Sequence, residues 1–400
     1  MVRKKRKPKP PFLRPGARAP RRPSLTKQLG RSFRKYPVLR AAYVEVCRRF
    51  EDIVGVCGIG VGRKFSESTR QYLSAPESTG GLCIKVFVER KRKQVPRKDR
   101  IPAWINVSVK DERKKTRVLL DIVSVVGKSR KRLVAVFQNG RGWPEAGKIT
   151  PGRFFAFGKK RASVIGNRPF TAKEVSLGTT CAVVRFEDGS HYGISAGHVF
   201  TDACSASAQQ PEGARALGVK GREWKQVQGT KFYPVTIRTN EWIRDVMLFP
   251  FPSSFRPSAE EVTWPDGFLR ELATQADIER AVLSEKPTGF IWVDRKGHRP
   301  EAIPVDLEAG IQSFKVPVQC GNIVKSLTYV MTWPLRFMSN QSTIGGDSGS
   351  PVFLWTEDNS KCRLLGIHFL RLHGHAYAMD ARAFFREVLL ANLNENVWFV

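Results

Sequence analysis

Apolar residues recur at helical spacing near the start of the chain. Between Pro37 and Asp52 the pattern is that of an amphipathic helix with one buried face, formed by Val38, Leu39, Ala42, Tyr43, Val46 and Phe50. Three runs of alternating or continuous apolar residues follow, and they predict β-strands at 53–61, 82–88 and 118–126. One helix and about three strands predict a small α/β domain over residues 36–132.

Gly58, Gly60 and Gly62 alternate inside the first of these strand patterns. Their spacing invites comparison with a phosphate-binding loop, but the Gly-Lys-Ser/Thr ending of such a loop does not follow. Glycine within a strand also permits the close approach of another backbone. We therefore expect these glycines to serve close packing.

From about residue 169 the pattern changes to short β-like segments separated by Gly, Pro and Asp. Many short strands predict two successive β-barrels, which we assign to residues 169–400. Residues 133–168 show little periodicity, and we interpret them as a linker. Near the end, helical spacing returns and predicts a C-terminal helix, with apolar positions Phe384, Phe385, Val388 and Leu389.

Charge is the exceptional feature of the composition. The chain carries 68 Lys and Arg against 36 Asp and Glu, a formal net charge of +32. Residues 1–35 are rich in Lys, Arg and Pro, and no acidic residue occurs before Glu45. Such a segment cannot bury enough apolar surface to order itself, so we expect a disordered basic arm. It would attract nucleic acid or another polyanion through phosphate contacts, and the alternative is a solvated tail without a ligand.

Targeting and membrane-spanning segments are not expected. The basic N-terminus is not followed by the apolar run that secretion requires, and no apolar stretch approaches the length of a membrane helix. The 7 cysteines are scattered and form no Cys-x-x-Cys pair, which favours reduced thiols and a cytoplasmic location over a disulfide framework. No cofactor is indicated. No metal site is expected either, because His368, His373 and His375 lack acidic or cysteine ligands at a familiar spacing.

One short motif carries the chemistry, Gly346-Asp347-Ser348-Gly349-Ser350-Pro351. A serine between glycines at the end of a tight polar turn is well placed to act as a nucleophile. The glycine at 346 lets its own N–H and that of Ser348 point into one small space, where two donors would stabilise an oxyanion. Gly, Asp and Ser also form ordinary turns, so the motif gains weight only from a base and an orienting carboxylate elsewhere.

Both of those groups occur earlier in the chain. Ser195-Ala196-Gly197-His198 follows a strand-like run and a turn, which suits His198 as a general base. Asp245 precedes alternating apolar residues typical of a half-buried strand, and it could orient the imidazole. Each residue alone has an ordinary structural interpretation. The order His, Asp, Ser makes coincidence a poor explanation.

With these motifs the chain resembles the chymotrypsin-like serine proteases, particularly bacterial trypsin-like and glutamyl endopeptidases, over roughly residues 170–400. The resemblance implies a serine peptidase in which His198 is the base, Asp245 orients it and Ser348 is the nucleophile. The oxyanion donors would be the N–H groups of Gly346 and Ser348. It implies a mostly β fold, in which a two-barrel domain with a C-terminal helix follows the basic arm and the small α/β domain along the chain.

The same resemblance places Thr343 and His368 in the pocket for the residue before the cleaved bond. A hydroxyl and an imidazole N–H can both donate to a carboxylate or amide oxygen, which predicts cleavage after Glu or Gln. Ser342 stands where trypsin-like enzymes carry an aspartate, so no anion is expected there to hold Lys or Arg. The alternative for His368 is a buried strand histidine with a structural hydrogen bond.

Two further points remain open in the sequence. Asp347 occupies the position that pairs with a newly cut N-terminus in the animal enzymes, but no Ile-Val-Gly-Gly activation sequence is present. Asp347 would then accept bonds from its own loop or from an arginine. The alternative function is a nucleic-acid-binding or assembly protein built on a protease fold, as in alphavirus capsid proteins. A complete triad argues against that alternative, because binding needs none of it.

Overall fold

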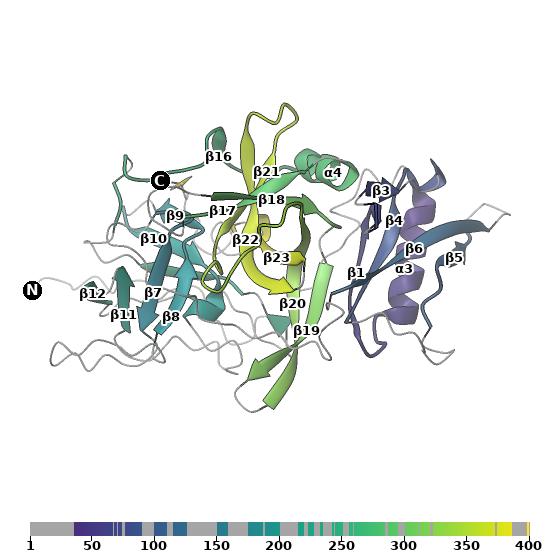
Figure 1. The fold of residues 1–400 in the computed structure, drawn as a ribbon, viewed down its shortest axis with the longest axis horizontal. Coiled ribbons are helices and arrows are strands. Elements are labelled where there is room, and N and C mark those ends of the chain that lie inside the picture. Colours follow the sequence, from purple (N-terminus) through teal and green to yellow (C-terminus); the bar gives the residue numbers. More distant parts are fainter. Residues whose placement is uncertain are drawn as a thin grey trace, which may run out of the picture.

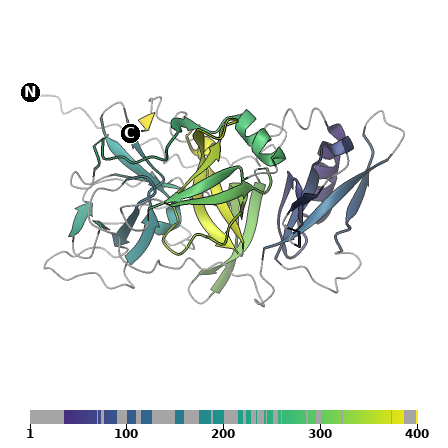
Figure 2. The same ribbon diagram turned by 45° about the horizontal axis from the view of Figure 1, so that its top comes forward.

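The computed structural model describes residues 36–399 except 67, 70, 74–76, 90–99, 110–114, 126–149, 159–174, 187–188, 201–214, 220–222, 228–232, 235–241, 244, 251–255, 259, 285–286, 295–300, 311, 321–322, 373 and 386–397. The expected arm at 1–35 lies outside the described residues. Three units follow one another in space. The α/β unit lies at one end, a closed β-barrel in the middle and another β unit at the far end (Figure 1). The rotated view keeps the same order (Figure 2).

The α/β unit is a four-stranded sheet covered by one helix. Helix α3 (Pro37–Phe50) begins with a proline at its first turn, where the missing N–H costs nothing. Its apolar stripe is buried against the sheet, as the spacing predicts, through Val38, Leu39, Ala42, Val46 and Phe50. The sheet has the order β1-β4-β6-β5, with β1 (Val56–Gly62), β4 (Cys83–Val88), β5 (Trp104–Val107) and β6 (Thr116–Ser124). A short hairpin, β2 (Lys64–Ser66) and β3 (Gln71–Leu73), and the 3-10 turn η1 (Glu77–Thr79) complete the unit.

Both faces of this sheet are covered. Every residue of β1 and β4 is buried, although helix α3 can cover only one face. The other face packs on the middle barrel, where the N–H of Gly310 donates to the carbonyl of Val61 at 2.9 Å. A Cβ on Gly62 would lie 2.3 Å from the carbonyl oxygen of Glu308, so close backbone packing requires glycine at this position.

The end unit is built from two sheets, which we call the first β unit. One has the order β12-β11-β7-β8 and the other the order β13-β15-β10-β9-β24. Aromatic rings fill the space between the sheets. The rings of Phe155 and Phe200 stack on each other, and both contact the ring of Phe249 at a tilt. The strand bounds are β7 (Phe154–Gly158), β8 (Val175–Thr179), β9 (Ala182–Arg185), β10 (His191–Ser195), β11 (Arg215–Val219), β12 (Glu223–Val227), β13 (Tyr233–Pro234), β15 (Met247–Pro250) and β24 (Trp398–Phe399).

The middle unit, which we call the second barrel, is a closed ring of six antiparallel strands. The pairing runs β17-β18-β20-β23-β22-β21 and returns to β17. These strands are β17 (Gly289–Val293), β18 (Glu301–Leu307), β20 (Ile323–Phe337), β21 (Pro351–Trp355), β22 (Cys362–Leu372) and β23 (His375–Asp380). Three more strands join the outside, β14 (Trp242–Ile243), β16 (Phe268–Leu272) and β19 (Gln312–Cys320). Helix α4 (Gln275–Leu283) begins at a capping box formed by Thr274 and Asp277.

The predicted fold class is confirmed: the chain is mostly β, with an α/β unit ahead of a two-part β body. The expected C-terminal helix begins as α5 (Ala381–Phe384), and residues 386–397 lie outside the described part. The linker at 133–168 is too long. It contains β7, which pairs with β8 and β11, so the β body begins near Thr150 rather than at residue 169. The apolar run of β7 does not alternate, so its sequence carries no clear strand pattern.

The sequence predicts no membrane-spanning helix, no metal site and no disulfide framework, and the described residues bear on each point. Within that part, no helix is long and apolar enough to cross a membrane. The described side chains also contain no group of three or more His, Cys, Asp or Glu that could hold a metal ion. Five of the cysteines are free thiols, namely Cys47, Cys57, Cys83, Cys181 and Cys362.

Candidate active site

Antiparallel pairing brings His198 and Asp245 to one end of the first β unit. The end of β10 pairs with the start of β15, with Ser195 opposite Met247. His198 follows β10 on the short turn η4 (Gly197–Val199), and Asp245 precedes β15. Two positions 47 residues apart in sequence therefore become neighbours.

The Asp245 carboxylate contacts His198 through both of its oxygens. Oδ2 accepts from the ring Nδ1 at 2.6 Å, and Oδ1 accepts from the backbone N–H of His198 at 2.7 Å. Both side chains are buried, which strengthens these charge-assisted bonds. Because an ionised carboxylate only accepts, the hydrogen sits on Nδ1, and Nε2 keeps a lone pair for taking up a proton.

The Ser348 loop is joined to the same region through Thr179 at the end of β8. The Thr179 hydroxyl donates to the carbonyl of Gly346 at 2.8 Å, and its N–H donates to the carbonyl of Ser348 at 2.8 Å. The carbonyl of Thr179 accepts from the hydroxyl of Ser195 at 2.6 Å, three residues before His198. One residue thus ties the serine loop to the segment that carries the histidine.

Two backbone N–H groups of this loop are unused. Within the described part of the chain, neither the N–H of Gly346 nor that of Ser348 donates to another group. Gly346 has a φ of 99°, a left-handed conformation that favours glycine. The Ser348 side chain is half-buried, and its hydroxyl donates to the carbonyl of Phe369 at 3.5 Å, a long and weak contact.

The carboxylate of Asp347 is bonded within its own loop. Its Oδ2 accepts from the N–H of Ile344 at 2.7 Å, and its own N–H donates to the carbonyl of Ile344 at 3.2 Å. The hydroxyl of Ser350 donates to the carbonyl of Asp347 at 2.7 Å. Bonds from its own loop, one of the two arrangements that the sequence leaves open for Asp347, are therefore present.

His368 lies on β22 with its ring buried. Its Nδ1 lies 3.2 Å from the carbonyl of Tyr377, and because a carbonyl only accepts, the ring hydrogen is on Nδ1. Burial lowers the pKa of His368 to about 3, the bond to the carbonyl of Tyr377 opposes this shift, and the nearby cation of Arg371 acts in the same direction as burial. The ring is therefore neutral near pH 7, and Nε2 is an acceptor.

Thr343 is fully buried, and its hydroxyl has no hydrogen-bond partner among the described residues. Arg371, three residues after His368, donates to the carbonyl of Thr343 at 2.6 Å and to the hydroxyl of Ser342 at 3.0 Å. These bonds hold the segment of Ser342 and Thr343 against β22. Arg371 and Thr179 are the two site residues absent from the sequence prediction, since neither stands in a motif.

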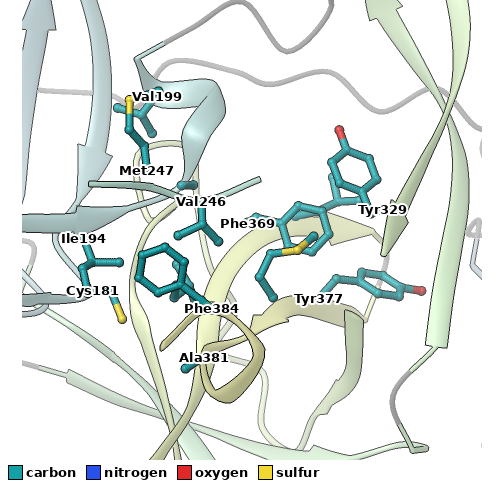
Figure 3. Packing of buried hydrophobic residues seen from close by; sticks show 14 of the residues in the cluster. Cys181, Ile194, Val199, Val246, Met247, Tyr329, Phe369, Tyr377, Ala381 and Phe384 are labelled. Carbon is teal, nitrogen blue, oxygen red and sulfur yellow. The ribbon is translucent and has the colours of Figure 1, made fainter. Parts of the chain in front are cut away.

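Apolar residues from the two β units pack against one another (Figure 3). Val199 and Val246, the direct neighbours of His198 and Asp245, lie on one side of this contact. Phe369 and Tyr377 approach from the second barrel. The polar groups therefore lie at the junction of the two units, where water is excluded from one side.

No protein-family model and no curated protein sequence matches the chain. Solved structures do show a likeness. The NS6 protease from murine norovirus 1 is 14% identical, with a TM-score of 0.25 over 47% of this chain and 80% of that one. A human pathogenic astrovirus serine protease is 13% identical, with a TM-score of 0.25 over 58% and 92%. Nocardiopsis protease (NAPase) is 10% identical, with a TM-score of 0.33 over 63% and 98%.

Values this low carry no argument about activity. The fold is established instead by the strand pairing, with a closed six-stranded ring behind a second β unit and a C-terminal helix. The chain therefore has a chymotrypsin-like fold.

Proposed function

We propose that this protein is a serine endopeptidase that cleaves peptide bonds through an acyl-enzyme on Ser348. The observation that carries the proposal is the pair of hydrogen bonds that the Asp245 carboxylate accepts from His198. The serine loop adds two backbone N–H groups, of Gly346 and Ser348, that donate to no other described group. A binding protein would have no use for an imidazole held in one tautomer. The alternative, an assembly protein on a protease fold, leaves this arrangement unexplained.

The reaction follows from the roles of these groups. The Ser348 hydroxyl turns from the carbonyl of Phe369, attacks the substrate carbonyl carbon and passes its proton to Nε2 of His198. The oxyanion accepts hydrogen bonds from the N–H groups of Gly346 and Ser348. The C–N bond then breaks as the imidazolium returns its proton to the leaving amine. Water activated by His198 attacks the ester and restores the enzyme.

The site requires no proteolytic activation in this proposal. Its support is the bond from the N–H of Ile344 to Oδ2 of Asp347, which holds this carboxylate within its own loop. We expect the chain to react with an active-site probe without prior cleavage.

Labelling with a fluorophosphonate probe tests the proposal directly. The parent chain should be labelled at Ser348, while Ser348→Ala and His198→Ala should lose labelling by several orders of magnitude. Ser360→Ala is a matched control, because Ser360 lies in an exposed turn. Equal labelling of parent and Ser348→Ala would disprove the mechanism.

The pocket supports a preference for Gln, and more weakly Glu, before the cleaved bond. A carboxamide presents one acceptor and two donors. The unpartnered hydroxyl of Thr343 can donate to its oxygen, and Nε2 of neutral His368 can accept from its NH₂ group. An ionised Glu needs His368 to take up a proton first. The cation of Arg371 near Ser342 disfavours Lys and Arg.

A peptide library with every residue at the position before the cleaved bond tests this preference. We expect cleavage after Gln at pH 7 and a rising share of cleavage after Glu as the pH is lowered. Thr343→Val should reduce kcat/KM for Gln peptides about tenfold, because it removes one donor. Cleavage only after Lys or Arg would overturn the assignment.

Residues 1–35 lie outside the described part of the chain, and their proposed role rests on charge alone. We propose that they localise the enzyme to nucleic acid or another polyanion. Binding of the full chain to single-stranded RNA should weaken steeply with salt and should drop on deletion of these residues. Salt-independent binding would exclude phosphate contacts.

A further inference from the structure

A buried lysine of the α/β unit reaches into the second barrel. Lys85 is fully buried on β4, on the sheet face opposite helix α3. Its ammonium contacts the carboxylate of Glu308, which directly follows β18, and it lies 3.2 Å from Asp121 of β6. A fully buried lysine occurs almost only where its charge is paired.

Glu308 is the centre of this ion cluster. Its Oε2 accepts from Nε of Arg336 at 2.5 Å, and its Oε1 accepts from Nη2 of the same guanidinium at 2.8 Å. Nε2 of His375 lies 3.9 Å from Oε2. Arg336 on β20 and His375 on β23 are directly opposite each other in the sheet. The cluster therefore connects the α/β unit to two strands of the second barrel.

The charges in the cluster are mutually dependent. Burial disfavours the charged form of Lys85, but Glu308 and Asp121 outweigh it and raise the pKa of Lys85. Burial likewise opposes ionisation of Glu308, yet Lys85 and Arg336 hold the pKa of Glu308 well below its usual range. Removing one partner from such a cluster leaves a buried charge uncompensated, which is more damaging than never having had the pair.

Strand β23 links this cluster to the candidate substrate pocket. His375 stands at its start, and two residues later the carbonyl of Tyr377 accepts from the ring of His368. The Tyr377 ring stacks on Phe314 at a centroid distance of 4.1 Å. It belongs to the same buried cluster as Phe87, the second residue after Lys85 on β4. Ionic and apolar contacts thus lead from the α/β unit to the group that orients His368.

We propose that Lys85 is a positioning residue for the substrate pocket, and that the α/β unit is a fixed part of the peptidase rather than an independent domain. Through Glu308 and Arg336, Lys85 sets the position of β23, and β23 sets the orientation of His368. The proposal rests on the proposed peptidase function for its kinetic consequence, although its structural consequence can be measured without hydrolysis.

Lys85→Met tests the proposal, with Val86→Ala as the matched control. Methionine matches the lysine side chain up to Cε and lacks only the ammonium. Arg336 still compensates Glu308, and Asp121, which loses the ammonium, is at the edge of the buried cluster with 11% of its side chain exposed, so the variant should fold. Val86 is the next residue on β4 and is fully buried on the face towards helix α3, so its truncation weakens the same unit without touching the cluster. Asp121→Asn is a milder change that removes one anion from Lys85 and retains Glu308.

For Lys85→Met we expect KM for a Gln peptide to rise about five- to tenfold, a typical size for coupling between two sites. Turnover at saturation and the rate of fluorophosphonate labelling should stay within about twofold of the parent, because the Asp245–His198 pair is untouched. Asp121→Asn should shift KM in the same direction by less. Val86→Ala should lower the melting temperature and leave KM unchanged.

Amide hydrogen exchange of the full chain tests the positioning role of Lys85 without depending on peptidase activity. Amides of β22 and β23 around His368 and Tyr377 should exchange faster in Lys85→Met and at the parent rate in Val86→Ala. If the parent fails to label, the peptidase assignment falls while the exchange result still tests the positioning role. Unchanged exchange and unchanged KM in folded Lys85→Met would overturn the proposal, and so would equal changes in Val86→Ala.

Discussion

The Asp245 carboxylate accepts two hydrogen bonds from His198, one from the ring Nδ1 at 2.6 Å and one from the backbone N–H at 2.7 Å. The backbone bond positions the turn, and the side-chain bond sets which ring nitrogen carries the hydrogen. In Asp245→Asn the amide can present an NH₂ group to Nδ1 and stabilise the wrong tautomer. We expect kcat to fall about 10⁴-fold with the fold retained.

Single-turnover labelling and peptide hydrolysis would measure this loss, and the melting temperature would report the fold. Asp358→Asn is a suitable control, because Asp358 is an exposed turn residue far along the chain. A labelling rate in Asp245→Asn within tenfold of the parent would show that His198 is oriented by something else.

At Gly349 the serine loop packs closely against the first β unit. It has a φ of 102°, and a Cβ there would lie 1.9 Å from the carbonyl oxygen of Thr179 and 2.2 Å from the hydroxyl of Ser195. Gly349→Ala adds backbone strain and forces the two segments apart. We expect a loss of stability on the order of 3 kcal/mol and a large loss of labelling.

Gly189→Ala is a control that introduces backbone strain from a positive φ without the steric contact expected in Gly349→Ala. Gly189 also has a positive φ, 77°, but nothing lies within 4 Å of its Cβ position. Its substitution should cost about 1 kcal/mol from the left-handed conformation alone and leave labelling intact. Urea unfolding of both variants measures the difference, and equal losses would mean that the contact with Thr179 contributes nothing.

His368 makes stability depend on pH in acid. Its pKa is about 3 in the folded chain, below the ordinary value of 6.5, so the unfolded chain binds the extra proton between these values. Stability of the parent should therefore fall as pH is lowered from about 7 towards 4, by at most about 1.4 kcal/mol per pH unit from this group. In His368→Gln this contribution is absent, so the stability gap between parent and variant should narrow as the pH falls.

Urea unfolding at pH 7 and pH 5 would measure that gap. His191→Gln serves for comparison, because His191 is only partly buried and should affect the pH dependence less. A gap for His368→Gln that stays constant between the two pH values would contradict the assignment of a buried neutral ring.

The sequence predicted what short motifs and strict periodicity determine. The helix of the α/β unit was recognisable because its apolar stripe is regular. His198 and Asp245 were recognisable as candidates because each stands beside a strand pattern, and the structure places them in contact. Such features are local, because each can be assigned from one short segment of the chain.

Features that depend on distant contacts were not predictable. Lys85 and Glu308 are 223 residues apart, and a charged residue inside a strand pattern is ordinarily expected to face solvent. The role of Arg371 likewise depends on the loop that packs against it. Strand β7 has no recognisable strand pattern, because adjacent Phe154 and Phe155 break the alternation that marks a half-buried strand, although both are buried here.

Asp306 provides an opposite pH effect that does not depend on the peptidase assignment. Its Oδ1 accepts from the hydroxyl of Thr288 at 3.1 Å, while its buried Oδ2 has no partner in the described part of the chain. Burial, reinforced by the charge of Glu308, raises the pKa of Asp306 to about 8. The folded chain therefore holds a proton that the unfolded chain has released, and stability should fall as pH rises from about 4 to 8. Asp306→Asn removes this titration. The melting temperature of the variant should therefore rise relative to that of the parent as the pH is raised from 6 to 9. Parallel curves for the two chains over this range would mean that Asp306 is already ionised in the fold.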